Sequence, residues 1–297
     1  MSDNWPRTPP RKILLATDLS ARSDRALDRA AQLARQWKSE LLVVHALEKP
    51  PVNSSWAQSD ETPSWRRPPD PARTIEQQIR RDVREDVDNL KICIQEGEPA
   101  DVVLAIAERE EADLIVLGTA RSETLGRMML GNTIENLVRK SPVSVLVVKS
   151  RPRGPYRHVL TGTDFTEESR HGLTIATGLF PEADHVLMHA FEMPYRALML
   201  DTKLGHDFSA METATIKSFL DESNIPEAIR ARVHPLIEHG PPEGMLRNYV
   251  TERDADLVVI GAYSRSLTFH ILIGGTARRI VDAVPSDVLV VRAHRAA

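Results

Sequence analysis

Short apolar runs alternate along this chain with longer segments in which apolar residues recur every three or four positions. The first run covers residues 13–16, and in the segment after it the apolar residues that share one helical face are Ala26, Leu27, Ala30, Leu33, Ala34 and Trp37. Continuous apolar runs of this length are typical of strands buried on both faces of a parallel sheet. The later runs of the first half lie at 41–46, 90–94, 114–117 and 143–148. Strands that alternate with helices predict an α/β domain with helices on both faces of a parallel sheet.

The whole pattern occurs twice. The landmarks that recur 143 residues apart are Gly118 and Gly261, Gly131 and Gly274, and Pro142 and Pro285. A chain of 297 residues also exceeds the size at which a single core usually stops growing. We therefore expect two domains of one type, at residues 8–150 and 156–294. The linker between them, 151–156, is short, so the domains are expected to pack against each other.

Local signals refine the element boundaries. Ser20 is the predicted N-cap of the first helix, and apolar residues in one stripe predict a helix over 74–87. The stretch 49–72 is rich in proline and serine and is expected to be a long loop, which is often a functional feature. Cys93, the only cysteine, lies in the apolar alternation of a strand and is interpreted as a small buried hydrophobe.

Composition and charge exclude several classes of protein. The chain is 41% hydrophobic and 27% charged, with a formal net charge of −4, which gives no general attraction to nucleic acid or to anionic membranes. Its start lacks the apolar run of a secretory signal, and no apolar segment approaches the roughly 20 residues that span a bilayer. We expect a cytoplasmic protein that binds neither nucleic acid nor membrane.

The carboxyl ends of the strands hold the candidate chemistry. Ligands of open parallel sheets bind there, and helix N-termini at this edge favour anions. Gly118 permits a tight turn after the fourth strand, and Gly131, Asn132 and Thr133 place backbone N–H groups at a helix start, where phosphates could bind. Asp18, after the first strand, could accept hydrogen bonds from a ribose hydroxyl or an adenine amino group. The alternative is that the glycines only make turns and that Asn132 only caps its helix.

Paired motifs in the two halves carry a family resemblance. They are TDLS (17–20) and TDF (163–165), VHA (44–46) and MHA (188–190), ADLIVLG and ADLVVIG on the fourth strands, and SPVSVLVV and PSDVLVV at the fifth. In these motifs the chain resembles the universal stress protein family, in its tandem two-domain form, over nearly its whole length. The resemblance implies an open five-stranded parallel sheet in order 3-2-1-4-5 in each domain. It also implies that the fifth strands of the two domains pair, with 143–148 antiparallel to 288–291.

The resemblance further implies an ATP site, because members that bind ATP carry G-x2-G-x9-G-[S/T] after the fourth strand. Both copies here depart from that pattern: Arg121 replaces the second glycine of the first copy, and Ser264 that of the second. The predicted nucleotide-binding residues are Asp18, Ala46, Gly118, Arg121, Gly131, Asn132 and Thr133 in the first half, and Asp164, Ala190, Gly261, Ser264, Gly274, Gly275 and Thr276 in the second. Arg121 either blocks close approach of phosphate or offers it a guanidinium. Glycine spacing favours the second copy as the nucleotide-binding site.

Nine of the ten histidines follow residue 157, which raises the question of a metal site. His185 and His189 point to one side of a strand but lie about 13 Å apart, too far to share a metal. No metal is expected. His45 and His189 recur in both copies and are interpreted as packing or hydrogen-bonding residues at strand ends rather than as catalysts.

These observations favour a stress-linked regulatory or binding protein that takes ATP, ADP or AMP at degenerate glycine-rich loops and has no dedicated catalytic site. One alternative is an interaction module whose nucleotide sites have decayed, which Arg121 and Asn132 favour. Another is an enzyme that hydrolyses ATP slowly, although the G-x4-G-K-[S/T] and G-x-S-x-G signatures are missing. Expected partners are other proteins, not identified by the sequence, and a second copy of the chain in a homodimer.

Overall fold

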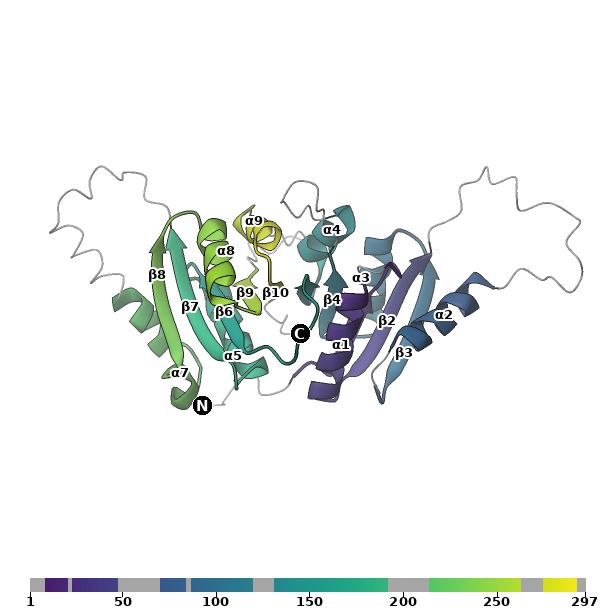
Figure 1. Ribbon diagram of the computed structural model, residues 1–297, viewed down its shortest axis with the longest axis horizontal. Helices are drawn as coiled ribbons and strands as arrows, with labels where there is room; N and C mark the ends of the chain where they lie inside the picture. The colour runs from purple at the N-terminus through teal and green to yellow at the C-terminus, as the bar shows by residue number, and fades with distance from the viewer. Residues whose placement is uncertain are drawn as a thin grey trace, which may run out of the picture.

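The computed structural model describes residues 9–20, 23–47, 70–83, 87–119, 131–191, 214–262 and 275–292. The two halves of the chain stand side by side, the first from purple to teal and the second from teal through green to yellow (Figure 1). Each half is a sheet with helices packed on it, as the alternation of apolar runs and helical segments predicts.

The first half contains all five predicted strands. Its elements are β1 (Lys12–Ala16), α1 (Asp24–Trp37), β2 (Glu40–Leu47), α2 (Pro71–Asp82), β3 (Leu90–Glu96), α3 (Pro99–Arg109), β4 (Leu114–Gly118), α4 (Asn132–Lys140) and β5 (Ser144–Val148). The core positions of β1, β4 and β5 are almost fully buried, which explains why these strands are continuous apolar runs.

The second half repeats this order. Its elements are β6 (His158–Thr163), α5 (Glu167–Leu179), β7 (Asp184–Phe191), a helix over 214–221, α7 (Glu227–Arg230), β8 (Val233–His239), α8 (Pro242–Arg253), β9 (Leu257–Gly261), α9 (Gly275–Ala283) and β10 (Asp287–Val291). The short α7 has no counterpart among the described elements of the first half.

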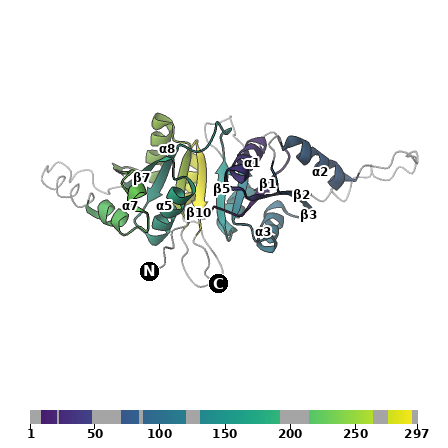
Figure 2. The same ribbon diagram turned by 90° about the horizontal axis from the view of Figure 1, so that it is seen from below.

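The strands of both halves form one ten-stranded sheet in the order β3-β2-β1-β4-β5-β10-β9-β6-β7-β8. Each half therefore has the order 3-2-1-4-5 with parallel neighbours, as the family resemblance implies. The halves meet where β5 and β10 run antiparallel, with Leu146 opposite Leu289 (Figure 2). The predicted pairing of the fifth strands is confirmed, and it leaves neither of these two strands as an exposed edge.

Two hydrophobic layers cover the faces of the sheet and extend through both halves. One layer joins alternate strand residues such as Leu14 and Ile115 to α3, and continues to Val258 and Val288 of the second half. The other joins Ile13 and its neighbours to α1 and continues to Leu289. Because both layers cross the junction, the halves share one continuous core.

Several predicted boundaries need correction. Ser23, not Ser20, is the N-cap residue of α1, although its side chain donates to Asp18 and makes no capping hydrogen bond. The helix predicted over 74–87 begins at Pro71, where Asp70 caps it, and ends at Asp82. Cys93 is only partly buried, since β3 is the outer strand of the sheet. Most of the proline-rich stretch predicted as a loop, 49–69, lies outside the described residues.

Candidate functional site at the strand ends

The first candidate site lies where strand order reverses between β1 and β4. Ala16 pairs with Leu117 of β4 and with Val44 of β2, so Asp18, Ala46 and Gly118 all come at the same carboxyl edge. The structure thus brings these three predicted positions to one end of three adjacent strands. This is the edge at which open α/β sheets bind ligands.

A tight turn holds Asp18. Its Oδ1 accepts hydrogen bonds from Ser20 N (3.0 Å), Ser20 Oγ (2.6 Å) and Ser23 Oγ (2.5 Å). Burial by itself would raise the pKa of Asp18, but the hydrogen bonds from Ser20 and Ser23 together lower it. Leu19, between Asp18 and Ser20, has a φ of 60°, a conformation that non-glycine residues adopt only when local contacts enforce it. Asp18 is therefore an anion that shapes its own turn.

The second half builds the same turn with fewer hydrogen bonds. Asp164 Oδ1 accepts from Thr166 N (3.2 Å) and Thr166 Oγ1 (2.6 Å), and Phe165 has a φ of 63°. Ser169, which corresponds to Ser23, instead shares a hydrogen bond with Thr163 (2.9 Å between the hydroxyl oxygens). Both aspartates are exposed to solvent. Among the described residues, the carboxylate of Asp164 has fewer hydrogen-bond partners than that of Asp18.

Two equivalent histidines support these turns from the neighbouring strands. His45 Nδ1 lies 2.9 Å from the carbonyl oxygen of Thr17, and His189 Nδ1 lies 2.8 Å from that of Thr163. A carbonyl oxygen can only accept, so Nδ1 carries the proton and Nε2 of each neutral ring is an acceptor. The predicted hydrogen-bonding role of His45 and His189 is confirmed.

The helix that follows the first glycine-rich loop begins with an open N-terminus. Gly131 is its N-cap, Asn132 and Thr133 are its first two residues, and no side chain of a described residue caps it. The alternative that Asn132 caps α4 is therefore wrong. A Cβ added at Gly131 would meet nothing within 4 Å, so the described atoms leave space beside the exposed start of the helix.

Gly261 has a packing role that its place in the glycine pattern does not reveal. A Cβ at this position would lie 2.4 Å from the carbonyl oxygen of Glu168 and 2.8 Å from the backbone nitrogen of Ser169. The first turn of α5 therefore packs directly on the end of β9, where only glycine fits. In the second half, Gly275 and Thr276 are the first two residues of α9, and Thr276 Oγ1 accepts from Arg279 (3.2 Å).

Three predicted site residues, Arg121, Ser264 and Gly274, lie outside the described residues. Their roles stay predictions. The described part of each site is thus the end of three strands together with the first residues of the helix after the glycine-rich loop, α4 in the first half and α9 in the second.

A row of rings along the strand ends of the second half was not predicted. Phe165 contacts His189 (4.2 Å between ring centroids) and Phe219 (5.5 Å), His189 stacks on Phe191 (5.3 Å), and Phe191 contacts His239 (4.6 Å). The row passes from the buried Phe219 to the exposed His239. The alternation of His189 and Phe191 along one strand face is the signal in the sequence that could have revealed it.

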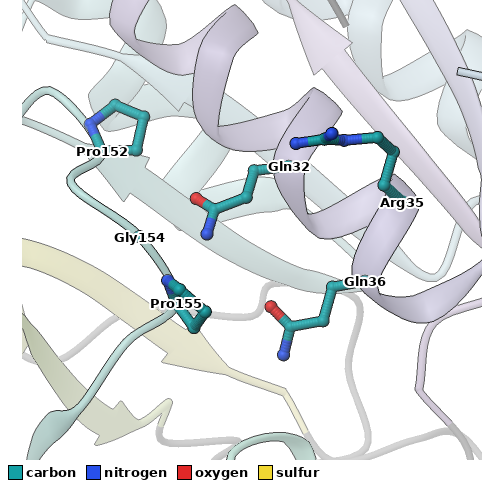
Figure 3. Close-up of a pocket in the computed structure, with 6 residues that line it drawn as sticks. All are labelled: Gln32, Arg35, Gln36, Pro152, Gly154 and Pro155. Atoms are coloured by element: carbon teal, nitrogen blue, oxygen red, sulfur yellow. The ribbon is translucent and has the colours of Figure 1, made fainter. Parts of the chain in front are cut away.

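A separate hollow lies at the linker and not at the strand ends. It has a volume of about 510 Å³ and is lined by Gln32, Arg35 and Gln36 of α1 and by Pro152, Gly154 and Pro155 (Figure 3). No predicted site residue lines it. Within the described ranges there is no group of three or more His, Cys, Asp or Glu residues placed to hold a metal. None of the helices in the described part of the chain has the length and apolar character needed to cross a membrane.

Comparison with known proteins gives a family match in each half. The model of the universal stress protein family matches residues 10–149 and 155–292. A universal stress protein of Mycolicibacterium smegmatis is 24% identical over 305 residues, covering 94% of this chain and 96% of that protein. One from Thermus aquaticus is 32% identical over 140 residues, covering 46% of this chain and 97% of that protein.

Solved structures show the same fold at low sequence identity. A protein of unknown function from Pseudomonas aeruginosa, PA1789, is 19% identical, with a TM-score of 0.69, and the match covers 97% of this chain and 94% of that one. At this level of identity, the likeness concerns the fold alone.

Proposed function

The chain belongs to the universal stress protein family, and we propose that it is a cytoplasmic regulatory binding protein that takes an adenine nucleotide at the strand ends of each half. The ligand is ATP, ADP or AMP, and the proposal includes no dedicated catalytic residue and no metal. The observation that supports it most is the repeated turn that exposes an aspartate at the switch point of each sheet, beside residues of the degenerate glycine pattern.

The proposed roles follow from the donors and acceptors at the edge of the first half. All hydrogen bonds that described residues make to the Asp18 side chain go to Oδ1, so Oδ2 is assigned to a ribose hydroxyl or to the adenine amino group. The backbone N–H groups of Asn132 and Thr133 are assigned to phosphate, since a helix N-terminus favours anions. Gly118 and Ala46 leave the strand ends accessible to the ligand.

In the second half the corresponding residues are Asp164, Ala190, Gly261 and the loop that ends in Gly274, Gly275 and Thr276. Asp164 is the less engaged of the two aspartates, so we expect it to bind ligand more strongly than Asp18. Ser264 replaces glycine with a small residue, whereas Arg121 introduces a large cation. The second half is therefore the stronger of the two proposed sites.

Native mass spectrometry of freshly purified protein is the first test, because a retained adenine nucleotide would identify the ligand class directly. Calorimetric titration with ATP then compares wild type with Asp164→Asn, which keeps a side-chain oxygen for the turn but removes the charge. Loss of charge-assisted hydrogen bonds should weaken binding about tenfold. Absence of any ATP binding to the wild type at millimolar concentration would overturn the proposal.

Two glycine variants compare the loops. Gly274→Val should weaken ATP binding more than Gly131→Val, because the second loop is the proposed stronger site. The opposite order would mean that the first loop is the stronger site, with Arg121 contacting phosphate. Gly131→Val also serves as a folding control, since the described atoms around Gly131 leave room for a side chain.

An interaction module without nucleotide is the second candidate function. Arg121 and Asn132 favour it, because both depart from the ATP-binding pattern at phosphate positions. In that case the purified protein carries no nucleotide, and the Asp18 and Asp164 variants do not change its ligand content. Release of phosphate from ATP by the purified protein, abolished by Asp164→Asn, would instead favour the enzyme.

A further inference from the structure

The junction between the halves contains a contact that each half makes to the other. Lys149, just after β5, donates from Nζ to the carbonyl oxygens of Val281 and Val284 (2.5 Å for Val284) at the end of α9. Arg292, which is 143 residues after Lys149, donates from Nη2 to the carbonyl oxygens of Val138 (2.6 Å) and Arg139 (3.2 Å) at the end of α4. The two halves therefore exchange the same contact, as the halves of a symmetric dimer would.

One pair of equivalent positions breaks this symmetry. Ser144 Oγ accepts from the backbone nitrogen of Arg292 (3.1 Å). The equivalent residue of the second half is Asp287, whose Oδ1 accepts from the backbone nitrogens of Lys149 (2.8 Å) and Ser150 (3.0 Å). A neutral hydroxyl in one half thus corresponds to a carboxylate in the other, and Asp287 has no exposed surface.

Two side chains stabilise the Asp287 carboxylate, and neither has a counterpart at the equivalent position of the other half. Arg29 of α1 forms an ion pair with Oδ2 (3.4 Å), and the hydroxyl of Tyr156, from the start of the second half, donates to the same oxygen (2.6 Å). The Arg29 guanidinium lies 4.0 Å from the centre of the Tyr156 ring and also donates to the carbonyl oxygen of Gly154 (2.8 Å). Both residues are 4% exposed. In α5, the position equivalent to Arg29 is Ile175.

An ion pair nearer the surface likewise joins unlike residues at equivalent positions of the two halves. Arg278 of α9 lies 2.8 Å from Glu135 of α4, and these residues are themselves equivalent positions, 143 apart. Two first halves paired in this way would place glutamate against glutamate. Two second halves would place arginine against arginine.

We propose that the junction is a one-way pairing surface, in which a first half accepts only a second half as its partner. Two paired second halves would bury two Asp287 carboxylates, each beside an isoleucine instead of Arg29. Two paired first halves would bury two Arg29 guanidinium groups opposite Ser144, with no carboxylate. Because a buried charge that has lost its ion-pair partner is strongly unfavourable, both like pairings are disfavoured. Each assembled molecule then holds one strand-end site of each kind, whatever ligand those sites take.

A nicked chain tests this pairing directly. A recognition sequence for a site-specific protease, inserted after Arg153 in the exposed linker, allows the folded full chain to be cut into its two halves. The nicked wild type is incubated with an isotope-labelled nicked copy, and native mass spectrometry counts the pairs. We expect that labelled and unlabelled halves exchange, and that every pair nevertheless contains one first half and one second half. Like pairs at the statistical proportion would overturn the proposal.

Charge-removing variants of the uncut chain give an independent test. Arg29→Met removes the cation that pairs directly with Asp287 and should lower the Tm by about 10 °C. Asp287→Ser, which copies Ser144, should lower it similarly. The double variant should recover most of the loss, because neither charge is then left unpaired. Simple addition of the two losses would contradict the proposal.

The same variants show whether the charges set the choice of partner and not only stability. In the nicked form of the double variant, like pairs should appear, since both halves then have a neutral junction at these positions. Arg151→Met is the matched control, because Arg151 is an exposed cation at the same junction that pairs loosely with Asp28 (3.9 Å). Its Tm and pairing should equal those of the wild type. Absence of like pairs in the nicked double variant would show that other contacts select the partner.

Discussion

The strand ends of the two halves have the same backbone and different surroundings. Leu19 and Phe165 adopt φ angles of 60° and 63°, and His45 and His189 donate to equivalent carbonyl oxygens. In the second half Phe165 begins a row of rings, whereas the first half has Leu19 at that place. The turn is thus set by short-range hydrogen bonds, and each half can change the side chains behind it without losing its shape.

The register of the outer strands shows how far this difference extends. Leu47 pairs with Glu96 in the first half, and Phe191 pairs with His239 in the second. One edge therefore ends in an aliphatic and a charged side chain, and the other ends in two rings in contact (4.6 Å). A duplicated fold has diverged at the positions where ligands of open sheets bind.

The largest expected effect separates glycines that look equivalent in the sequence pattern. Gly261→Ala places a Cβ against the backbone of Glu168 and should lower the free energy of unfolding by about 3 kcal/mol, at the upper end of overpacking effects. Gly131→Ala meets nothing within 4 Å and should change it by less than about 1 kcal/mol. Urea unfolding of both variants measures the difference. Equal stabilities would mean that α5 can shift away from β9.

The pH dependence of the free energy of unfolding should distinguish Lys149 from Arg292. Burial lowers the pKa of Lys149 to about 8, against the opposing effects of Asp282 and Asp287, from an ordinary value of 10.5. Between these values the unfolded chain binds one more proton than the folded chain, so the free energy of unfolding rises with pH. From pH 7.5 to 9.5 the rise attributed to Lys149 should be about 2 kcal/mol.

Lys149→Met should abolish this rise. Arg292→Met should keep it, because burial lowers the pKa of Arg292 only to about 10. Chemical unfolding at several pH values up to 9.5 avoids the ionisation of Tyr156, whose pKa is raised by burial. A slope that survives in Lys149→Met would assign it to another group.

The row of rings should contribute moderately to stability, and only to the stability of the second half. Phe165→Leu copies the first half and removes two ring contacts, to His189 and Phe219, which should lower the free energy of unfolding by about 1.5 kcal/mol. Hydrogen exchange should show the loss of protection in α5 and β7 and none in β1 and β2. Equal loss of protection in both halves would mean that the junction transmits the change.

The smallest effect compares the two aspartates in the absence of ligand. Asp18→Ala removes three hydrogen bonds from its turn and Asp164→Ala removes two, so their effects should be about 1 kcal/mol and somewhat less. Thermal melts with and without ATP also test the proposed function. Lower melting temperatures combined with an unchanged ATP-induced shift would assign both residues to the turn alone.

The sequence by itself determined the architecture. The apolar runs predicted the strands, and the repeated landmarks predicted two domains of one type. The family motifs implied that β5 and β10 would pair, which Leu146 opposite Leu289 confirms. Asp18, Ala46 and Gly118 were also expected at one edge, because the carboxyl ends of parallel strands meet there. The strands, the two domains and the shared edge follow from periodicity and from strand direction, both of which a linear sequence contains, whereas the pairing of β5 with β10 was implied by the family resemblance.

Only the tertiary structure decided what the individual polar and small residues do. Asp287 is assigned no role by the sequence pattern, but in the structure it receives a hydrogen bond from Tyr156, 131 residues away. Gly261 looked like part of a ligand loop, but α5 packs directly on it. The helix begins after Ser23 and not after the predicted cap Ser20, and Asp18 accepts hydrogen bonds from the hydroxyls of both serines. A buried charge or a close backbone contact depends on groups brought together from distant parts of the chain, and periodicity does not record which groups those are.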